Sequence, residues 1–227
     1  TAITDFDDLL RVRPDVPHYR ENLARTQTNL AQVQNTMGRN AEAKVECMAA
    51  LGEFIDLVNS NPDVHDYHEA QATSSATFGR ILRDLNEDRL AEEAFRGAVE
   101  RLAELATKAN EVPRYRSRLA FARSGLGRTL HKMGKHDAAK TEFLEAIKSF
   151  QSVTNDGSDD PVSQDGLAWC YTHLGDLLRE TILKLCDALR KPEGLDEVRL
   201  DMARGALRIL VQGPHFIPRD RKMAYVD

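Results

Sequence analysis

The chain has 227 residues, of which 41% are hydrophobic and 30% are charged, and its formal net charge is −5. This acidic balance disfavours nucleic acid as a partner, because nucleic-acid-binding domains usually carry a basic surface. No window approaches the roughly 18 consecutive apolar residues of a membrane span, so we expect no membrane partner either. Three cysteines without CxxC spacing (Cys47, Cys170 and Cys186) indicate neither a disulfide framework nor a zinc site. A reducing compartment, and hence a cytoplasmic location, is the expectation.

Small and apolar residues recur along the chain with a period of 48 residues. Tyr19, Tyr67 and Tyr115 keep this step, each just after a turn that bears Pro or Val. Periods of about 20–50 residues are typical of repeat proteins, in which each unit buries its apolar face against its neighbours. Alanines and large apolar residues follow the same period: Ala24, Ala72, Ala120 and Ala168; Leu30, Phe78, Leu126 and Leu174; Ala43, Ala91 and Ala139.

Within each period the apolar spacing is helical and indicates two helices joined by a short turn. Residues 1–13 lie one period before the end of the first pair, so they are interpreted as the end of an earlier helix. Gly38 and Gly134 mark two of the turns, and Asn86 takes the same place in the second unit, because these residue types tolerate left-handed backbone. The predicted helix pairs are 17–37 with 40–60, 65–85 with 88–109, 113–133 with 136–153, and 162–190 with 195–212.

Small residues recur where the paired helices are expected to approach closely. Ala31, Gly79, Gly127 and Gly175 fall on the first helices, one period apart. Larger residues are predicted to fill the space between paired alanines on the second helices and give an interdigitated core. These are Cys47, Phe95 and Phe143, so Cys47 is interpreted as a packing residue.

The spacing of these residues resembles the tetratricopeptide repeat family. Leu126-Gly127, Gly134, Ala139, Phe143 and Ala146 match the family pattern, although the present period is longer than the usual 34 residues. The resemblance implies an all-α fold, a right-handed superhelical α-solenoid of antiparallel helix pairs, with about four repeats and a partial N-terminal helix. The Pro-Asp-Val-Pro-x-Tyr junction at residues 14–19 is similar to that of repeat regions attached to planctomycete serine/threonine protein kinases. No kinase signature occurs in the chain.

The domain prediction is a single array over residues 1–227. Its repeats are 14–61, 62–109 and 110–157, followed by a longer fourth repeat at 158–212 and a tail at 213–227. In the fourth repeat the second-helix pattern returns 12 residues later than the period predicts, around Ala206 and Leu210. The insertion is interpreted as a lengthened first helix, which serves either as an array cap or as a protruding docking or self-association hairpin.

The family resemblance places a concave groove on the first helices, and the residues offset from the packing stripe indicate its lining. Arginine binds carboxylates bidentately and aromatic side chains anchor apolar groups, which suits an acidic, partly apolar protein or peptide segment. The alternative is that these arginines are solvated or paired with acids such as Asp84 and Asp176. The candidate partner-binding residues are Arg80, Arg83, Phe121, Arg128, His131, Lys132, Trp169, Thr172 and Arg179.

One subgroup of the resembled family holds chaperone C-termini through a clamp of Lys and Asn. The matching positions here carry other residue types, so this specific function is disfavoured: Thr28, Gln32, Thr77, Phe121 and Gly125. The chain has no GxGxxG, P-loop, HExxH or GxSxG motif, and we expect no catalytic residues, no metal and no cofactor.

The leading prediction is a non-catalytic scaffold for protein–protein interaction within a larger signalling protein. The alternatives are a structural spacer or homo-oligomerising module, and a docking or regulatory region of an upstream serine/threonine kinase.

Overall fold

The computed structural model describes residues 2–13, 16–109, 111–155 and 161–190, and the regular elements among them are all α-helices. The chain divides into two compact units, Thr1–His173 and Leu174–Asp227, and α8 runs from the first into the second. The helices are α1 (Ala2–Val12), α2 (Pro17–Thr36), α3 (Asn40–Ser60), α4 (His65–Asp84), α5 (Asp88–Lys108), α6 (Pro113–Lys132), α7 (His136–Asn155) and α8 (Pro161–Arg190).

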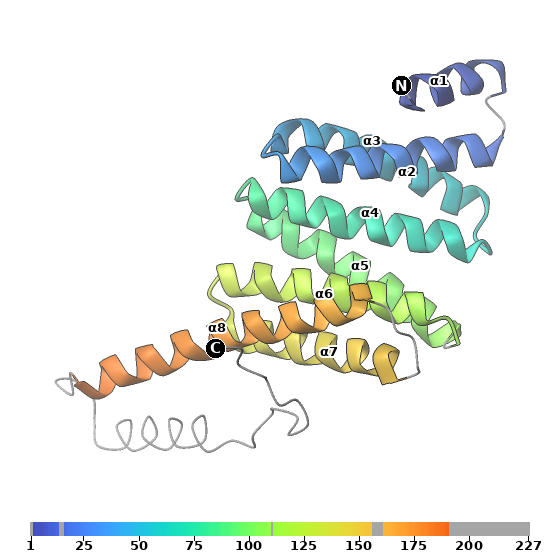
Figure 1. Ribbon diagram of the computed structural model, residues 1–227. Helices are drawn as coiled ribbons and strands as arrows, with labels where there is room; N and C mark the ends of the chain where they lie inside the picture. Colours follow the sequence, from blue (N-terminus) through green and yellow to red (C-terminus); the bar gives the residue numbers. More distant parts are fainter. Residues whose placement is uncertain (1, 14–15, 110, 156–160, 191–227) are drawn as a thin grey trace, which may run out of the picture. The chain divides into compact units, whose positions relative to one another are not determined.

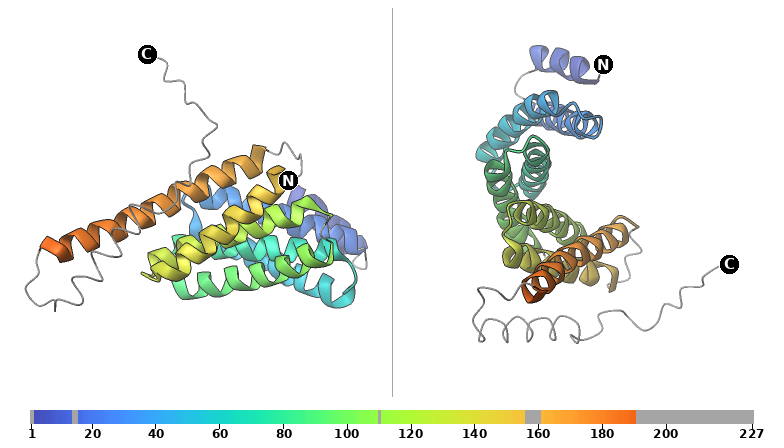
Figure 2. Two further views of the ribbon diagram at one scale, coloured as in Figure 1. Left: turned by 90° about the horizontal axis from the view of Figure 1, so that it is seen from below. Right: turned by 90° about the vertical axis from the view of Figure 1, so that its left-hand side faces the viewer.

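In the first unit, consecutive helices form antiparallel pairs, α2 with α3, α4 with α5 and α6 with α7, and the pairs stack (Figure 1). Helix α4 also contacts α2 and α6, so the first helices of these pairs lie side by side along the stack (Figure 2). The predicted all-α solenoid is therefore confirmed. The seven predicted helices that fall within the described residues each begin and end within two residues of the observed bounds. The predictions for 191–194, 195–212 and 213–227 lie outside the described residues.

Each pair is closed by a tight turn whose central residue has left-handed backbone. The φ angles are +77° at Gly38, +63° at Asn86 and +75° at Gly134, as the residue types predict. The residue after each of these donates its N–H to a carbonyl five positions earlier, for example Lys135 to Leu130 at 2.9 Å. These bonds satisfy carbonyl groups that the end of a helix otherwise leaves without a partner.

The recurring tyrosines have a backbone role at the start of each pair. Tyr115 donates its N–H to the carbonyl of Val112 at 3.2 Å, and the earlier tyrosines make the equivalent bond at 3.1 Å. The valines have extended backbone and precede the first helical residue, where Pro17 and Pro113 take the position that needs no N–H partner. The Tyr115 side chain is buried in an apolar cluster with Leu102 and Leu119.

A seam of glycines and aromatic rings joins the helices. A Cβ atom placed on Gly79 would lie 2.8 Å from the Phe95 ring, and one on Gly127 would lie 2.9 Å from Phe143. These approaches confirm the predicted interdigitation, although Gly175 has no such neighbour among the described residues. Cys47 takes the equivalent place in the first pair, where burial raises the pKa of its thiol to about 12.

The second unit contributes the end of α8 to the described residues. Within it Thr181 donates its hydroxyl to the carbonyl of Leu177 at 2.9 Å, and Arg179 donates to Asp176 at 3.4 Å. Both bonds are local to the helix.

Candidate functional site

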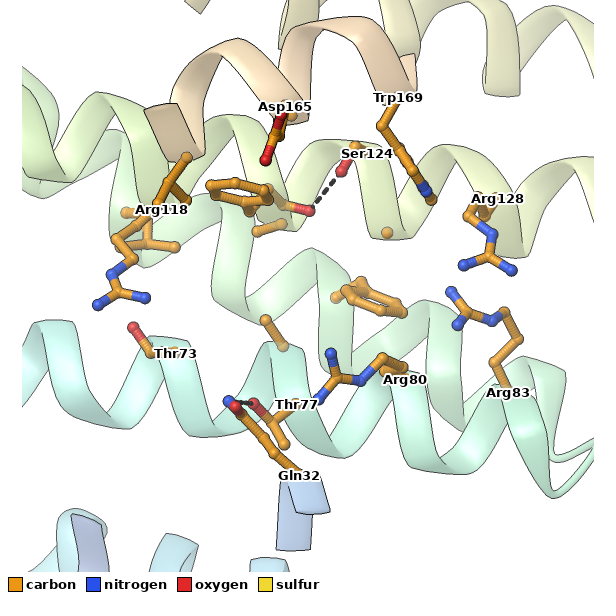
Figure 3. Close-up of a pocket in the computed structure, with 18 residues that line it drawn as sticks. Gln32, Thr73, Thr77, Arg80, Arg83, Arg118, Ser124, Arg128, Asp165 and Trp169 are labelled. Atoms are coloured by element: carbon orange, nitrogen blue, oxygen red, sulfur yellow. Dashed lines mark hydrogen bonds between the residues drawn. The ribbon is translucent and has the colours of Figure 1, made fainter. Parts of the chain in front are cut away.

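A cavity of about 540 Å³ opens on the first unit and is lined by side chains from α2, α4, α5, α6 and the first turns of α8 (Figure 3). We call it the arginine cavity, because Arg80, Arg83, Arg118 and Arg128 all border it. The lining starts at Gln32 on α2 and reaches the beginning of α8, so it crosses successive repeats of the stack.

The floor of the cavity is built by the glycine seam. Phe95 comes from α5 and reaches the cavity between α4 and α6, where Gly79 and Gly125 present no side chain. A Cβ atom on Gly125 would collide with the Phe95 ring. Leu102 and Ala122 extend this apolar floor. The close packing that holds the array together therefore also closes the bottom of the cavity with apolar atoms.

Two aromatic side chains stand on the wall formed by α6 and α8. Phe121 lies edge-on to Phe150, with ring centroids 4.9 Å apart and planes at 80°. The Trp169 ring carries the guanidinium of Arg128 at 5.1 Å from its centroid, which is a favourable cation–π geometry. His173 packs edge-on against Trp169 at 4.0 Å and holds it from the next turn of the helix.

Three guanidinium groups gather at one end of the cavity (Figure 3). Arg83 is only 6% exposed and donates to Asp84 at 3.3 Å. The Nε atom of Arg80 is buried and has no hydrogen-bond partner. Among the described residues, no ion pair joins Arg80 or Arg128 to a carboxylate. We call Arg80, Arg83 and Arg128 the arginine trio.

Burial and like charge disfavour the charged forms of Arg80 and Arg128. Burial lowers the pKa of Arg80, and the positive charge of Arg83 lowers it further, whereas Asp84 raises it. The pKa of Arg128 is lowered by burial and by Arg83 in the same way. Both groups stay charged at neutral pH because arginine titrates far above it. The trio thus places three positive charges around one carboxylate.

The other end of the cavity has a different character. Arg118 is half-exposed there and lies 3.7 Å from Glu69, while Thr73 and Asp165 add neutral and negative groups (Figure 3). Positive charge is balanced at this end and in excess at the trio, so the cavity is polarised along its length.

The structure brings five of the nine predicted binding residues together and places the other four elsewhere. Arg80, Arg83, Phe121, Arg128 and Trp169 line the arginine cavity.

His131, Lys132 and Thr172 are outside the lining, and Arg179 belongs to the second unit. The His131 ring packs edge-on against His136 at 5.5 Å, and the exposed Thr172 donates its hydroxyl to Ala168.

Lys132 has a structural role. Its ammonium group donates to the Arg83 carbonyl, to Asn86 Oδ1 and to Asp88 Oδ1, each at 2.8 Å. These bonds fasten the end of α6 to the α4–α5 turn. All three donors of the ammonium are used, and the carboxylate of Asp88 balances its positive charge.

Several lining residues were not among the predicted binding residues, and Arg118, Val162 and Asp165 are three of them. Arg118 lies one helical turn before Phe121, and Val162 and Asp165 lie one or two turns before Trp169. Extending the predicted groove positions backwards by one or two turns from the recurring alanines would have found them. Two of the positions that match the chaperone-binding clamp of one subgroup contact each other between repeats: Gln32 donates to Thr77 at 3.1 Å.

Comparisons with known proteins agree with this architecture. Residues 122–152 match the family profile described as Tetratricopeptide repeat. Among solved structures, the chain is similar to the crystal structure of BtubC (BKLC) from P. vanneervenii. The two are 16% identical, with a TM-score of 0.58 over 100% of this chain and 94% of that one, a likeness that shows the fold alone. A search of curated proteins gives no match.

Together these findings support a tetratricopeptide-like array. Such repeats generally mediate binding between proteins, and the fold is typically non-catalytic. Within the described part of the chain, no helix combines the length and the apolar character that crossing a bilayer requires.

Proposed function

We propose that the protein is a non-catalytic scaffold that binds a segment of a partner protein in the arginine cavity. The segment carries negative charge toward the arginine trio and apolar side chains toward Phe121 and Val162. The proposal includes the longer fourth repeat of the domain prediction in the array. The junction motif favours a signalling context, with a kinase-associated protein as the setting.

The observation that carries this proposal is the uncompensated charge of the trio beside an apolar floor. Burying a charged group without a partner is costly, so a protein retains such an arrangement at a functional site more readily than elsewhere. Among the described residues, Arg80 has a buried Nε without a hydrogen-bond partner, and Arg128 lies over the Trp169 ring with no ion pair to a carboxylate. An acidic partner would supply the missing hydrogen bonds, and charge-assisted bonds of this kind are the stronger ones.

The extent of the cavity supports a chain segment as the ligand. The lining runs from Gln32 on α2 to Val162 on α8 and includes residues of both α4 and α6. An extended peptide can follow such a surface and use apolar and charged residues at different points. Aromatic and arginine side chains such as Trp169 and Arg128 are the residue types that dominate binding energy in protein interfaces.

The test is a pull-down with the full chain and two double variants. Arg80→Glu/Arg128→Glu reverses charge in the trio. Arg25→Glu/Arg96→Glu makes the same change of net charge at two exposed arginines that each pair with a glutamate four residues earlier. Thermal unfolding of wild type and both variants checks that all three proteins are folded.

We expect wild type and the control variant to retain the same partner proteins and the trio variant to lose them. Salt should weaken this binding. Equal retention by the trio variant would refute the proposed site. If the chain captures only itself and light scattering shows an oligomer in solution, the self-association alternative replaces the proposal.

A further inference from the structure

We infer that the arginine trio is a subsite for a dianionic phosphoryl group carried by the bound segment. This inference rests on the proposed function, because it names the chemistry of the partner at the same cavity. It would make recognition depend on phosphorylation of the partner.

Charge balance is the first argument. Arg80, Arg83 and Arg128 contribute three positive charges, and Asp84 is the carboxylate beside them. Asp84 is already engaged, since it also accepts a hydrogen bond from Asn35 at 3.0 Å. Two positive charges therefore remain uncompensated. A phosphoryl ester carries a charge of about −1.5 to −2 at neutral pH, which matches this excess, whereas a single carboxylate carries half of it.

Donor geometry is the second argument. The guanidinium groups of Arg80 and Arg83 come from α4, and that of Arg128 comes across from α6 (Figure 3). A carboxylate has two oxygens in one plane and is well served by one guanidinium fork. A phosphoryl group has three outward oxygens in a tetrahedral arrangement and can accept from several forks at once. Clusters of arginine are a recurring solution for phosphorylated motifs.

The surroundings favour a phosphorylated side chain over free phosphate. The cavity that the trio borders is also lined by the exposed apolar side chains of Phe121 (38% exposed) and Val162 (58%), and by Trp169, whose ring contacts Arg128. Free phosphate would leave this apolar surface exposed to water. A peptide that carries the phosphoryl group places its neighbouring apolar residues on that surface, which adds to the binding free energy.

The first arm of the test uses phenyl phosphate and phenyl sulfate as probes of the full chain. The two molecules have nearly the same shape, but the sulfate carries one negative charge and the phosphate close to two at about pH 7.5. Trp169 is the single tryptophan of the sequence and borders the cavity, so its fluorescence reports binding. We expect phenyl phosphate to bind at least about tenfold more tightly than phenyl sulfate.

The pH dependence sharpens this comparison. The second proton of a phosphoryl ester binds with a pKa of about 6, so at about pH 5 the phosphate is largely a monoanion. The preference over phenyl sulfate should then shrink to about twofold or less, whereas the affinity for the sulfate stays constant. Equal affinity of the two probes at both pH values would overturn the inference.

Matched variants locate the site. Arg80→Gln and Arg128→Gln each remove one trio charge, and Arg118→Gln removes one charge from the opposite end of the same cavity. The first two should weaken phenyl phosphate about tenfold or more, and Arg118→Gln by less than about twofold. Calorimetry replaces fluorescence for Arg128→Gln, because Arg128 contacts the reporter ring. A larger loss from Arg118→Gln would overturn the assignment.

The second arm tests the source of the phosphoryl group with arrays of random hexapeptides around a central phosphoserine, phosphotyrosine, serine or Asp-Asp pair. Selective retention on the phosphorylated arrays supports the inference. Equal retention on the Asp-Asp array overturns it but leaves the proposed acidic-segment function intact. Retention on no array, with phenyl phosphate bound as expected, also overturns it and indicates a small phosphorylated ligand. Retention on no array, together with a partner capture that the trio variant leaves unchanged, refutes the proposed function itself.

Discussion

The glycine seam and the arginine trio lie within one turn of each other on α4 and α6, yet they follow opposite rules. In the seam, each large ring meets a position without a side chain, as Phe95 does at Gly79 and Phe143 does at Gly127. The residues of the seam are buried and apolar. In the trio, charged groups of one sign are brought together with a single carboxylate.

The difference separates the residues that stabilise the array from the residues proposed to bind a partner. Close packing in the seam stabilises the fold, whereas burial and the like charge of Arg83 disfavour the charged forms of Arg80 and Arg128. Other basic residues show that the chain can satisfy its charges: Lys44 reaches both oxygens of Glu87 at 2.8 Å, and Lys135 reaches Glu92 at 2.7 Å. Arg80 and Arg128 differ from these lysines, because within the described residues no ion pair joins either of them to a carboxylate, and such exceptions are expected at functional sites.

The largest expected effect is on the seam. Phe143→Ala should lower the free energy of unfolding by about 3–5 kcal/mol, because Phe143 is fully buried and its loss leaves a cavity against Gly127. Denaturant unfolding followed by circular dichroism measures this. Leu144→Ala is the control, since this neighbouring side chain is partly exposed, and it should cost about 1 kcal/mol or less. Similar losses from both variants would show that the seam is not the main source of stability.

A second change tests the close approach directly. Gly125→Ala should destabilise the protein by about 1–3 kcal/mol, because the new methyl group overlaps the Phe95 ring. Gly97→Ala is the matched control. It lies within α5 with no atom within 4 Å of a Cβ position, so alanine there should stabilise the helix by about 0.5–1 kcal/mol. The two substitutions are chemically identical and should differ in sign; the same sign for both would contradict the packing described for the cavity floor.

The buried thiol of Cys47, which takes the place of a ring in the first pair, should make the stability of the protein depend on pH. The pKa of the Cys47 thiol is raised to about 12 by burial, whereas an unfolded thiol titrates near 8.5. The folded state therefore holds its proton in a range where the unfolded state loses it. The stability that this provides is fully present below about pH 8.5 and is lost as pH rises toward 12.

From about pH 8 to 9.5, the free energy of unfolding should fall by about 1 kcal/mol through this thiol. Urea unfolding at several pH values measures the decline. Cys47→Ala removes the titrating group, so the difference between wild type and variant isolates the contribution from those of lysine and tyrosine. If the free energy of unfolding depends on pH identically in both proteins, the predicted contribution of the Cys47 thiol is wrong.

The helices and turns could be predicted because their signals are local. Left-handed backbone at Gly38, Asn86 and Gly134 is a property of the residue type, and the Val–Tyr spacing repeats with the helix starts. The period then placed rings opposite glycines. Gly125 is an instructive omission: it does not share the register of Gly79 and Gly127, and its contact with Phe95 arises between neighbouring pairs instead of within one.

The cavity could be predicted only in part, because helical register shows on which side of a helix a residue lies but not which partner its side chain contacts. Arg80, Arg83 and Arg128 have the right offset and do border it. Lys132 lies one turn after Arg128 and shares its direction, but its ammonium group turns to Asp88 at the start of α5. Whether a surface charge is satisfied depends on residues 44–49 positions away, and no local pattern contains that information.

The smallest effect, and the sharpest comparison, comes from two charges on this surface. Lys132→Met should lower the free energy of unfolding by about 1 kcal/mol, because it removes three hydrogen bonds of a partly exposed ammonium group. Arg80→Met should change it by less than about 0.5 kcal/mol or raise it, because methionine keeps the apolar stem and removes a charge that has no partner. Both proteins are compared with wild type by denaturant unfolding at low and moderate salt. Salt screens the repulsion within the trio, so any gain from Arg80→Met should be larger at low salt. If Arg80→Met instead lowers the free energy of unfolding as much as Lys132→Met does, Arg80 stabilises the fold. The excess charge of the cavity would then no longer support a binding function.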